Sequence, residues 1–430
     1  MPPPGACTHR PPPGEPPVAA GRPRWEVADI FRLYGETYRQ SHPVSPAQHK
    51  VIDALRACRT ATLGGYTERC TQCGFERSAY RSCRNRHCPK CQSLPTAQWL
   101  EARTADLLPG PYFHTVFTLP HDLHPLVLQH KRVLLPLLFH AASETLLQFG
   151  QQTLGGQLGV TMVLHTWDQL LNAHFHVHCL VPAGALAEEG TRWVPSHPRF
   201  LFPVHAMSTV FRGKFLETLR HLSMTAAWAR SAPRPALGTP RDFSHLLDHL
   251  YDKDWVVYTK PTCPGPGQVL DYLGRYTHRV AIANHRFVAV DNGQVSFTYR
   301  NRRRENQQQI MTLTAHECIR RFLLHLVPHG CVRIRHYGFL ANRCKAGALR
   351  HCRQLLGQPP TPPPRARKTV AQWMQRWTGR DITRCPQCGH HPFVRLPLPM
   401  TVPAPMTRAP PRTARAMLSG HGVVPRPQAL

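Results

Sequence analysis

Apolar and polar residues alternate most clearly over residues 171–181, where His174, His176 and His178 are separated by single apolar residues. Successive side chains of a β-strand point to opposite faces, so a strand here carries the three imidazoles on one face. Two imidazoles that face one point could hold a divalent metal, since imidazole is the commonest metal ligand. The alternative is a row of solvent-facing polar residues on a half-buried strand.

The residues before this stretch predict a β-hairpin. Residues 160–167 form a second strand-like run, and only residues 168–172 separate it from the histidine strand. So short a connection favours antiparallel pairing. The candidates for a third metal ligand are His165, Asp168 and Gln169, which the hairpin brings close, and His174.

Elsewhere the apolar spacing switches between the helical and the strand period. Helices are predicted from Trp25 onward, after a Ser45 cap, and over residues 96–108, 126–149 with an interruption at Pro136, 207–228, 269–279 and 314–327. Strands are predicted over residues 112–119, 255–258, 287–290, 295–299 and 332–335. Asp291-Asn292-Gly293 predicts a hairpin turn, because Gly accepts a positive φ.

Two tyrosines lie four residues apart in the predicted helix 269–279. Tyr272 and Tyr276 would share one face of that helix and could simply be core residues of an amphipathic segment. The functional interpretation is a pair of nucleophiles held over a metal site. Arg275 and Arg279 beside them could then pair with phosphate oxygens.

Composition points to a polyanionic partner. The chain has 430 residues, and 53 Lys and Arg residues against 24 Asp and Glu residues give a formal charge of +29. Such an excess favours nucleic acid, with an anionic membrane surface as the alternative. We find no signal peptide and no apolar run long enough to span a bilayer, so we expect no membrane partner.

The cysteines predict structural zinc. The chain has 15 cysteines, an odd number, and several stand in Cys-x-x-Cys pairs, which suits metal ligands in a reducing cytosol better than disulfides. Two such pairs are separated by 14 residues, a specific pattern for one zinc held by four thiolates. The predicted ligands are Cys70, Cys73, Cys88 and Cys91. Three further residues could complete a second site or replace one of the four: Cys58, Cys83 and His87.

A third pair, Cys385 and Cys388, stands alone near the C-terminus. It could be half of a zinc ribbon whose other half is His390 and His391 or lies elsewhere in the chain. Upstream, residues 332–335 alternate apolar residues with arginine. An edge strand bearing Arg333 and Arg335, followed by His336 and Tyr337, suits phosphate contact and base stacking.

We expect four segments. Residues 1–24 read as a disordered Pro-rich leader, residues 25–95 as a helical and zinc-binding domain, and residues 105–345 as the main domain. Residues 358–430 read as a basic, Pro-rich tail carrying the lone cysteine pair.

Taken together, the motifs resemble those of the rolling-circle insertion-sequence transposases, members of the HUH superfamily of single-strand endonucleases. They occur in the family's order over roughly residues 50–345: residues 58–65, 82–92, 116–120, 164–167, the histidine strand, 272–279 and 333–338. The zinc module and the block at 333–338 favour the transposases over the other members of the superfamily. Tyr66 stands where the family usually has His, and Phe175 where Pro is usual.

The resemblance implies an α+β fold, in which a small N-terminal zinc-binding domain precedes an HUH nuclease domain with a central antiparallel sheet flanked by helices. It carries the metal-binding role onto His176 and His178 and the nucleophile role onto Tyr272 and Tyr276. The implied activity is nicking and rejoining of single-stranded DNA through a 5′-phosphotyrosine, with Mg²⁺ or Mn²⁺ at the HUH site and structural Zn²⁺.

The implied partners are single-stranded DNA at the ends of a mobile element and target DNA, in a bacterial cytoplasm at the nucleoid. Two alternatives remain at this stage. One is an HUH relaxase or replication initiator with the same chemistry. The other is a zinc-dependent DNA-binding protein without catalysis, which would explain the charge and the cysteines but neither the histidine strand nor the paired tyrosines.

Overall fold

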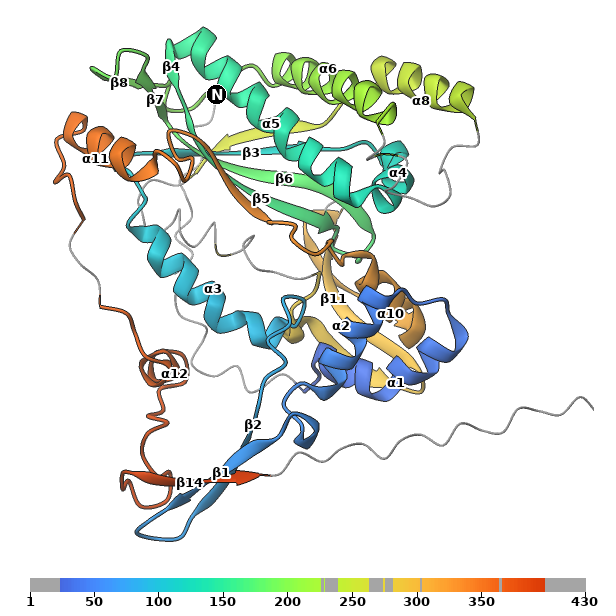
Figure 1. The fold of residues 1–430 in the computed structure, drawn as a ribbon, viewed down its shortest axis with the longest axis vertical. Helices are drawn as coiled ribbons and strands as arrows, with labels where there is room; N and C mark the ends of the chain where they lie inside the picture. The colour runs from blue at the N-terminus through green and yellow to red at the C-terminus, as the bar shows by residue number, and fades with distance from the viewer. Residues whose placement is uncertain are drawn as a thin grey trace, which may run out of the picture.

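The computed structural model describes residues 24–225, 228, 239–262, 274, 281–301, 304–362 and 366–398. Helices and antiparallel sheets share this part of the chain (Figure 1), so the predicted α+β fold is confirmed. Most of the predicted leader and the chain beyond residue 398 lie outside the described residues.

A five-stranded antiparallel sheet lies in the upper half of the molecule as drawn in Figure 1. Its strand order is β13-β5-β6-β3-β9, and its inner pair, β5 and β6, is the predicted hairpin. The Asp168 carboxylate closes the connecting turn by accepting the backbone N–H groups of Leu170 and Asn172, each at 2.8 Å. The strands are β3 (Tyr112–Thr118), β5 (Gly159–Trp167), β6 (Ala173–Pro182), β9 (Val257–Pro261) and β13 (Ile334–Gly338).

Long helices cover one face of this central sheet (Figure 1). Phe175, Val177 and Cys179 of β6 are wholly buried in the core beneath them, so the predicted alternation of this strand is confirmed. Burying a Phe or Val side chain contributes about 1.5–3 kcal/mol, which makes this face the main source of the sheet's stability. The helices are α4 (His124–Gln129), α5 (Lys131–Leu154), α6 (Val204–Ser223) and α8 (Pro240–Asp252).

The predicted helix 126–149 is divided at His130, not at Pro136. His130 leaves the helical conformation with φ −106° and ψ 35°, and α5 then runs through Pro136. Pro136 lies in the second turn of α5, so the helix continues past it with one backbone hydrogen bond fewer, because proline has no N–H to donate. Among the described residues α5 is the one helix long and apolar enough to cross a membrane, and here Phe139 and most of its leucines are buried in the core.

The opposite face of the central sheet carries the histidines, and α3 (Pro89–Thr104) extends along it (Figure 1). Near the end of α3, Leu100 and Leu107 pack against Tyr112 and Leu180 of the sheet. The helix begins earlier than the predicted residue 96, because Pro89 occupies its first turn, where a proline is preorganised. Beyond the far end of the sheet lie α11 (Lys345–Leu355) and a small sheet of β4 (Gly156–Gln157), β7 (Gly184–Ala187) and β8 (Trp193–Pro195).

A second core joins the N-terminal helices to a three-stranded sheet and α10. Phe31 of α1 meets Phe322 of α10 edge to face, with ring centroids 5.4 Å apart. The expected domain 25–95 therefore shares a core with residues 281–323. The elements are α1 (Val27–Ser41), α2 (Pro46–Ala57), β10 (Phe287–Asp291), β11 (Gln294–Asn301), β12 (Gln307–Thr314) and α10 (Ala315–Leu324).

Two local predictions in this region are confirmed. The Ser45 hydroxyl caps α2 by accepting the Gln48 N–H at 3.3 Å. The turn between β10 and β11 places Asn292 and Gly293 at φ 47° and 74°, as the Asn-Gly pair predicts.

A third, small sheet brings together distant parts of the chain. It has the order β14-β1-β2 and lies at the lower end of Figure 1. Its strands are β1 (Gly65–Cys70), β2 (Glu76–Tyr80) and β14 (Phe393–Leu398), and α12 (Val370–Thr378) precedes β14. The predicted C-terminal tail thus supplies one strand of a sheet begun near the N-terminus.

We predict that Gly338→Ala destabilises the central sheet. Gly338 ends β13 with φ 61°, and a Cβ there would lie 1.7 Å from the Leu158 carbonyl oxygen. The backbone strain alone costs about 1–3 kcal/mol, and the overlap adds to it, so the melting temperature of the full chain should fall. Gly347→Ala in α11 is the matched control, because a Cβ there meets nothing within 4 Å. Equal melting temperatures for the two variants would contradict the prediction.

Candidate functional site

Three imidazoles converge on the face of the central sheet opposite the long helices. The register of the β5–β6 hairpin sets His165 directly opposite His176, with Val163 opposite His178. His178 Nε2 lies 3.1 Å from His176 Nε2 and 3.1 Å from His165 Nδ1. His165, His176 and His178, here called the histidine triad, thus direct one nitrogen each toward a common point.

The ring orientations in the histidine triad are set by neighbouring groups. His176 Nδ1 lies 3.2 Å from the His174 carbonyl oxygen, so it must carry the proton, which leaves Nε2 as a lone-pair donor. His178 Nδ1 lies 2.8 Å from His114 Nε2 of β3. His165 is stacked on Trp167, with centroids 4.5 Å apart.

His114 is the neighbour that the sequence analysis missed. It is buried beside His178, and burial, reinforced by the charge of Lys260, lowers the pKa of His114 to about 3. The ring is therefore neutral at pH 7 and bonds His178 as an uncharged group. The signal for it was the alternation of residues 112–118, which places His114 on the histidine side of β3.

The geometry of the histidine triad fits a divalent metal. Ligands about 2.1 Å from a metal and at right angles to one another lie about 3.0 Å apart, close to the two separations of 3.1 Å. Neutral imidazoles suit Mn²⁺ better than Mg²⁺, which prefers oxygen. Sites with three protein ligands leave positions for water or substrate.

The other candidates for a third ligand do not join the converging nitrogens. The His174 ring lies 4.8 Å from that of His176, between centroids, and also packs beside His121 and His124. Its nitrogens are not among the converging ones. Gln169 is exposed in the turn past the end of β5, and its backbone oxygen accepts a hydrogen bond from Arg286 at 2.6 Å. Strand register, which pairs His165 with His176, is the physical reason that His165 completes the triad.

The predicted nucleophiles Tyr272 and Tyr276, together with Arg275 and Arg279, lie outside the described residues. Gly274, which stands between the two tyrosines in the sequence, is described. A Cβ on it would lie 3.1 Å from Leu100 Cδ1 of α3, so this point of the segment lies against the helix beside the histidine face.

The predicted DNA-contacting residues in β13 and directly before it face different surroundings. Arg335 lies with its guanidinium 4.3 Å from the Phe139 ring centroid, on the helix-covered face. Arg333 lies over Trp167 at 5.3 Å, and burial lowers its pKa to about 10, so it stays charged at pH 7. His336 bonds Thr161 Oγ1 at 3.0 Å on the histidine face, four residues or about 13 Å along β5 from His165.

Four cysteine sulfurs meet where α2 ends and α3 begins. Cys58 Sγ lies 3.8 Å from Cys88 Sγ and 3.5 Å from Cys91 Sγ, and Cys83 Sγ lies 3.6 Å from Cys91 Sγ. Thiolates placed tetrahedrally about 2.3 Å from zinc lie about 3.8 Å apart, so this first thiol cluster fits a structural zinc. Hydrogen bonding with Cys58 lowers the pKa of the Cys91 thiol and raises that of the Cys88 thiol.

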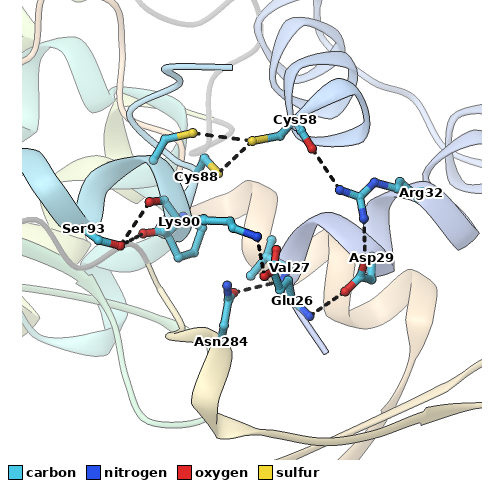
Figure 2. Close-up of polar contacts among 11 residues, drawn as sticks. Glu26, Val27, Asp29, Arg32, Cys58, Cys88, Lys90, Ser93 and Asn284 are labelled. Atoms are coloured by element: carbon cyan, nitrogen blue, oxygen red, sulfur yellow. Dashed lines mark hydrogen bonds and ion pairs between the residues drawn. The ribbon is translucent and has the colours of Figure 1, made fainter. Parts of the chain in front are cut away.

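The first thiol cluster is tied to the N-terminal core (Figure 2). Arg32 donates to the Cys58 carbonyl oxygen at 2.9 Å, and the Lys90 ammonium lies 2.7 Å from the Glu26 carboxylate. The Val27 N–H donates to Asn284 Oδ1 at 3.1 Å. The start of α3 is therefore held at the N-terminal end of α1, which is itself hydrogen-bonded to the segment that precedes β10.

The predicted zinc ligand set, Cys70, Cys73, Cys88 and Cys91, is divided between two clusters. Cys70 and Cys73 lie at the tip of the β1–β2 hairpin and meet Cys385 and Cys388, with Cys70–Cys388 and Cys73–Cys385 sulfur distances of 3.6 Å. A five-residue strand spans about 17 Å, so the tip cannot meet the first thiol cluster at the hairpin's base. We call these four residues the second thiol cluster.

Of the three further zinc candidates, two belong to the first thiol cluster and one does not. Cys58 and Cys83 are members. His87 is buried with its Nδ1 3.2 Å from Asn85 Oδ1, and it is not part of either cluster.

Comparison with known proteins agrees with this arrangement. Residues 159–347 match the family model "Putative transposase", and residues 30–119 match "Transposase zinc-binding domain". "Putative transposase y4qJ" of Sinorhizobium fredii (strain NBRC 101917 / NGR234) is 46% identical over 369 residues, which cover 84% of this chain and 92% of that protein. "Transposase for insertion sequence element IS801" of Pseudomonas savastanoi pv. phaseolicola is 29% identical over 346 residues, 79% and 81% of the two chains. No solved structure gives a significant match.

The central sheet with its histidine face and the adjoining cysteine clusters define a DNA transposase with a zinc-binding domain. The chain belongs to the insertion-sequence transposases of the rolling-circle HUH family, as its motifs predicted.

We predict that Cys58 and His87 differ in their effect on zinc content. Cys58→Ser should release one Zn²⁺ per chain, because it removes one of four sulfurs about 3.5–3.8 Å apart. His87→Ala should retain the ion. Plasma mass spectrometry of the purified full-length chain measures the metal, and circular dichroism checks folding. Zinc loss in the His87 variant alone would overturn the assignment of the first thiol cluster.

Proposed function

We propose that the chain nicks and rejoins single-stranded DNA through a 5′-phosphotyrosine intermediate during rolling-circle-type transposition. The observation that carries the proposal is the histidine triad: three imidazole nitrogens converge on the sheet face beside α3. A core strand has no packing reason to place three imidazoles together, whereas a nuclease needs a fixed point at which to hold a phosphodiester.

The charge of the chain supports single-stranded DNA as substrate. A net charge of +29 attracts phosphates by the electrostatic term that dominates nucleic-acid affinity. Arg333, charged and stacked over Trp167, lies one ring away from His165. It is therefore the described arginine best placed to meet a phosphate held at the histidine triad.

His165, His176 and His178 would hold a Mg²⁺ or Mn²⁺ ion, and the chemistry it supplies when bound is polarisation of the scissile phosphate and compensation of charge in the transition state. Imidazoles bind a metal in their uncharged form, so these three ligands would add no charge of their own. They orient the phosphate by fixing where its oxygens can lie.

The proposed nucleophile is the hydroxyl of Tyr272 or Tyr276. Its oxygen attacks phosphorus as the bond to the 3′ oxygen breaks, and the proton lost by the phenol balances the one gained by the departing 3′-hydroxyl. The phosphodiester energy is kept in the phosphotyrosine, so a 3′-hydroxyl can attack it later and restore the free tyrosine. A phenol has a pKa of about 10, so the site must help to remove its proton.

The two tyrosines suit strand transfer. One can hold the cleaved donor strand while the other cleaves or accepts a second strand in the same site. What supports their role is the family membership and the position of Gly274 between them, against α3 beside the histidine face.

A structural zinc in the first thiol cluster would serve this site indirectly. Cys88 and Cys91 lie at the start of α3. Leu100 in the last turns of the same helix, and Leu107 just beyond its end, pack on the sheet. A metal that holds the start of α3 therefore also fixes the position of this helix along the histidine face.

We predict that His114 positions His178 for metal binding. His114→Phe removes the 2.8 Å partner of His178 Nδ1, and the loss of such a supporting hydrogen bond typically weakens metal affinity about 10–100-fold. Isothermal titration with Mn²⁺ measures the affinity, and His114→Gln, which keeps a hydrogen-bonding group, should recover part of it. His336→Phe is the control, because that ring bonds Thr161 on the same face. Unchanged Mn²⁺ affinity in His114→Phe would rule out the positioning role.

The decisive test of the proposed function is covalent trapping. The full-length chain is incubated with labelled single-stranded DNA from the element's end and Mn²⁺ or Mg²⁺, and the products are separated under denaturing conditions. We expect a slow, metal-dependent band that disappears in the double variant Tyr272→Phe, Tyr276→Phe and persists in Tyr80→Phe, a change at an exposed tyrosine of β2. Tight DNA binding without such a band would favour the zinc-dependent binding protein.

A further inference from the structure

We infer that the second thiol cluster is a second structural zinc site, built jointly by the two ends of the chain. Residues 65–80 and 381–398 would form one split zinc ribbon around it. The matched zinc-binding family model ends at residue 119, so the C-terminal half of this site lies outside it. The inference does not depend on the proposed catalytic mechanism.

The two halves are built alike. Both read Cys-x-Gln-Cys-Gly, and the glycines after the second cysteine, Gly74 and Gly389, have φ of 72° and 73°. Each glycine N–H donates to the carbonyl of the first cysteine, Gly74 to Cys70 at 3.1 Å and Gly389 to Cys385 at 2.9 Å. Each half therefore makes the same tight turn and turns two sulfurs toward one side, which gives two ligands per half.

The sulfur geometry fits one tetrahedral ion. The Cys70–Cys388 and Cys73–Cys385 distances of 3.6 Å lie close to the value of about 3.8 Å for thiolates around zinc. All four sulfurs lie within 4.8 Å of one another. Four thiolates are a closed donor set, which is typical of a structural zinc and leaves no position for a substrate.

Strand pairing brings the halves together independently of the sulfurs. β14 pairs antiparallel with β1 from Cys70 opposite Phe393 to Gly65 opposite Leu398. In the middle strand, the buried Glu68 carboxylate accepts hydrogen bonds from Arg77 of β2 at 2.7 Å and Arg395 of β14 at 2.9 Å. One acid thus links all three strands.

Arg77 also contacts the C-terminal half directly. It donates to the Ile382 carbonyl oxygen at 2.6 Å and lies 4.4 Å from the Phe393 ring centroid. A guanidinium over the face of an aromatic ring is attracted to it electrostatically. These contacts align the two Cys-x-Gln-Cys-Gly turns but bury little apolar surface.

The small sheet needs a metal because it has almost no core. No residue of β2 or β14 is buried, and a sheet of this size is stabilised by packing or by a metal. The cluster joins residues 318 positions apart, and holding the ends of so long a loop together is entropically costly. The free energy of binding a structural zinc ion contributes directly to folding, and it would offset that cost.

The closed ribbon would hold the C-terminal segment along α3. Lys368, before α12, pairs with Glu101 of α3, and Arg353 of α11 donates to the Ala105 carbonyl oxygen beyond the end of α3. The segment after α11 therefore follows α3 from the sheet toward the ribbon (Figure 1). Helix α3, which begins in the first thiol cluster, is thus flanked by the C-terminal segment, and a zinc ion in the second thiol cluster would hold that segment in place.

The test is zinc stoichiometry in the full-length chain. Native mass spectrometry should find two Zn²⁺ per chain, one Zn²⁺ in the double variant Cys385→Ser, Cys388→Ser, and two in the matched double variant Cys331→Ser, Cys344→Ser, whose cysteines belong to neither cluster. A single Zn²⁺ in the unaltered chain, or two retained in the Cys385, Cys388 variant, would overturn the inference.

A second measurement guards against a variant that misfolds. The unaltered chain is treated with a chelator and mildly oxidised, and its disulfides are mapped by peptide mass. Peptides containing Cys70 or Cys73 should be cross-linked to those containing Cys385 or Cys388, with prior Zn²⁺ protecting them. Cross-linking that Zn²⁺ does not suppress would show proximity without metal binding and would also overturn the inference.

Discussion

The strand register between β5 and β6 is the constraint on which the histidine triad depends. It places His165 opposite His176, and the side-chain period of two then sets His178 on the same face. A slip of one residue would turn the imidazoles into the core. The wholly buried Phe175 and Val177 on the other face oppose such a slip, because it would expose them to water. Apolar packing on one side of the sheet therefore preorganises polar chemistry on the other.

Helix α3 connects this face to the cysteine clusters. Its first turn contributes Cys91 to the first thiol cluster, its last turns pack on the sheet, and the C-terminal segment follows its outer side. A structural metal is suited to this task, since four thiolates fix a helix end without needing a large core. The first thiol cluster and the histidine face are thus connected through one helix.

The electrostatics divide between surface and site. The chain is strongly basic, yet two histidines on the sheet face are neutral at pH 7, because burial lowers the pKa of His114 to about 3 and that of His336 to about 4. Neutral rings can offer lone pairs to a metal or to each other, which protonated rings cannot. Long-range attraction for DNA and local coordination chemistry therefore come from different groups.

The sequence alone determined the features that follow from local spacing. The alternation of apolar and polar residues predicted the β5–β6 hairpin and its histidine face. Local sequence also predicted the Ser45 cap and the Asn292-Gly293 turn, and the motifs identified the family. Tertiary structure decided which groups meet. One Cys-x-x-Cys pair supplies two ligands, whereas a structural zinc needs four. Only the fold could therefore bring Cys70 to Cys388 and Cys58 to Cys91. Likewise, strand register placed His165 rather than Gln169 beside His176 and turned Arg335 toward the core helices. Sequence spacing could not predict these contacts, because they join residues that are distant along the chain.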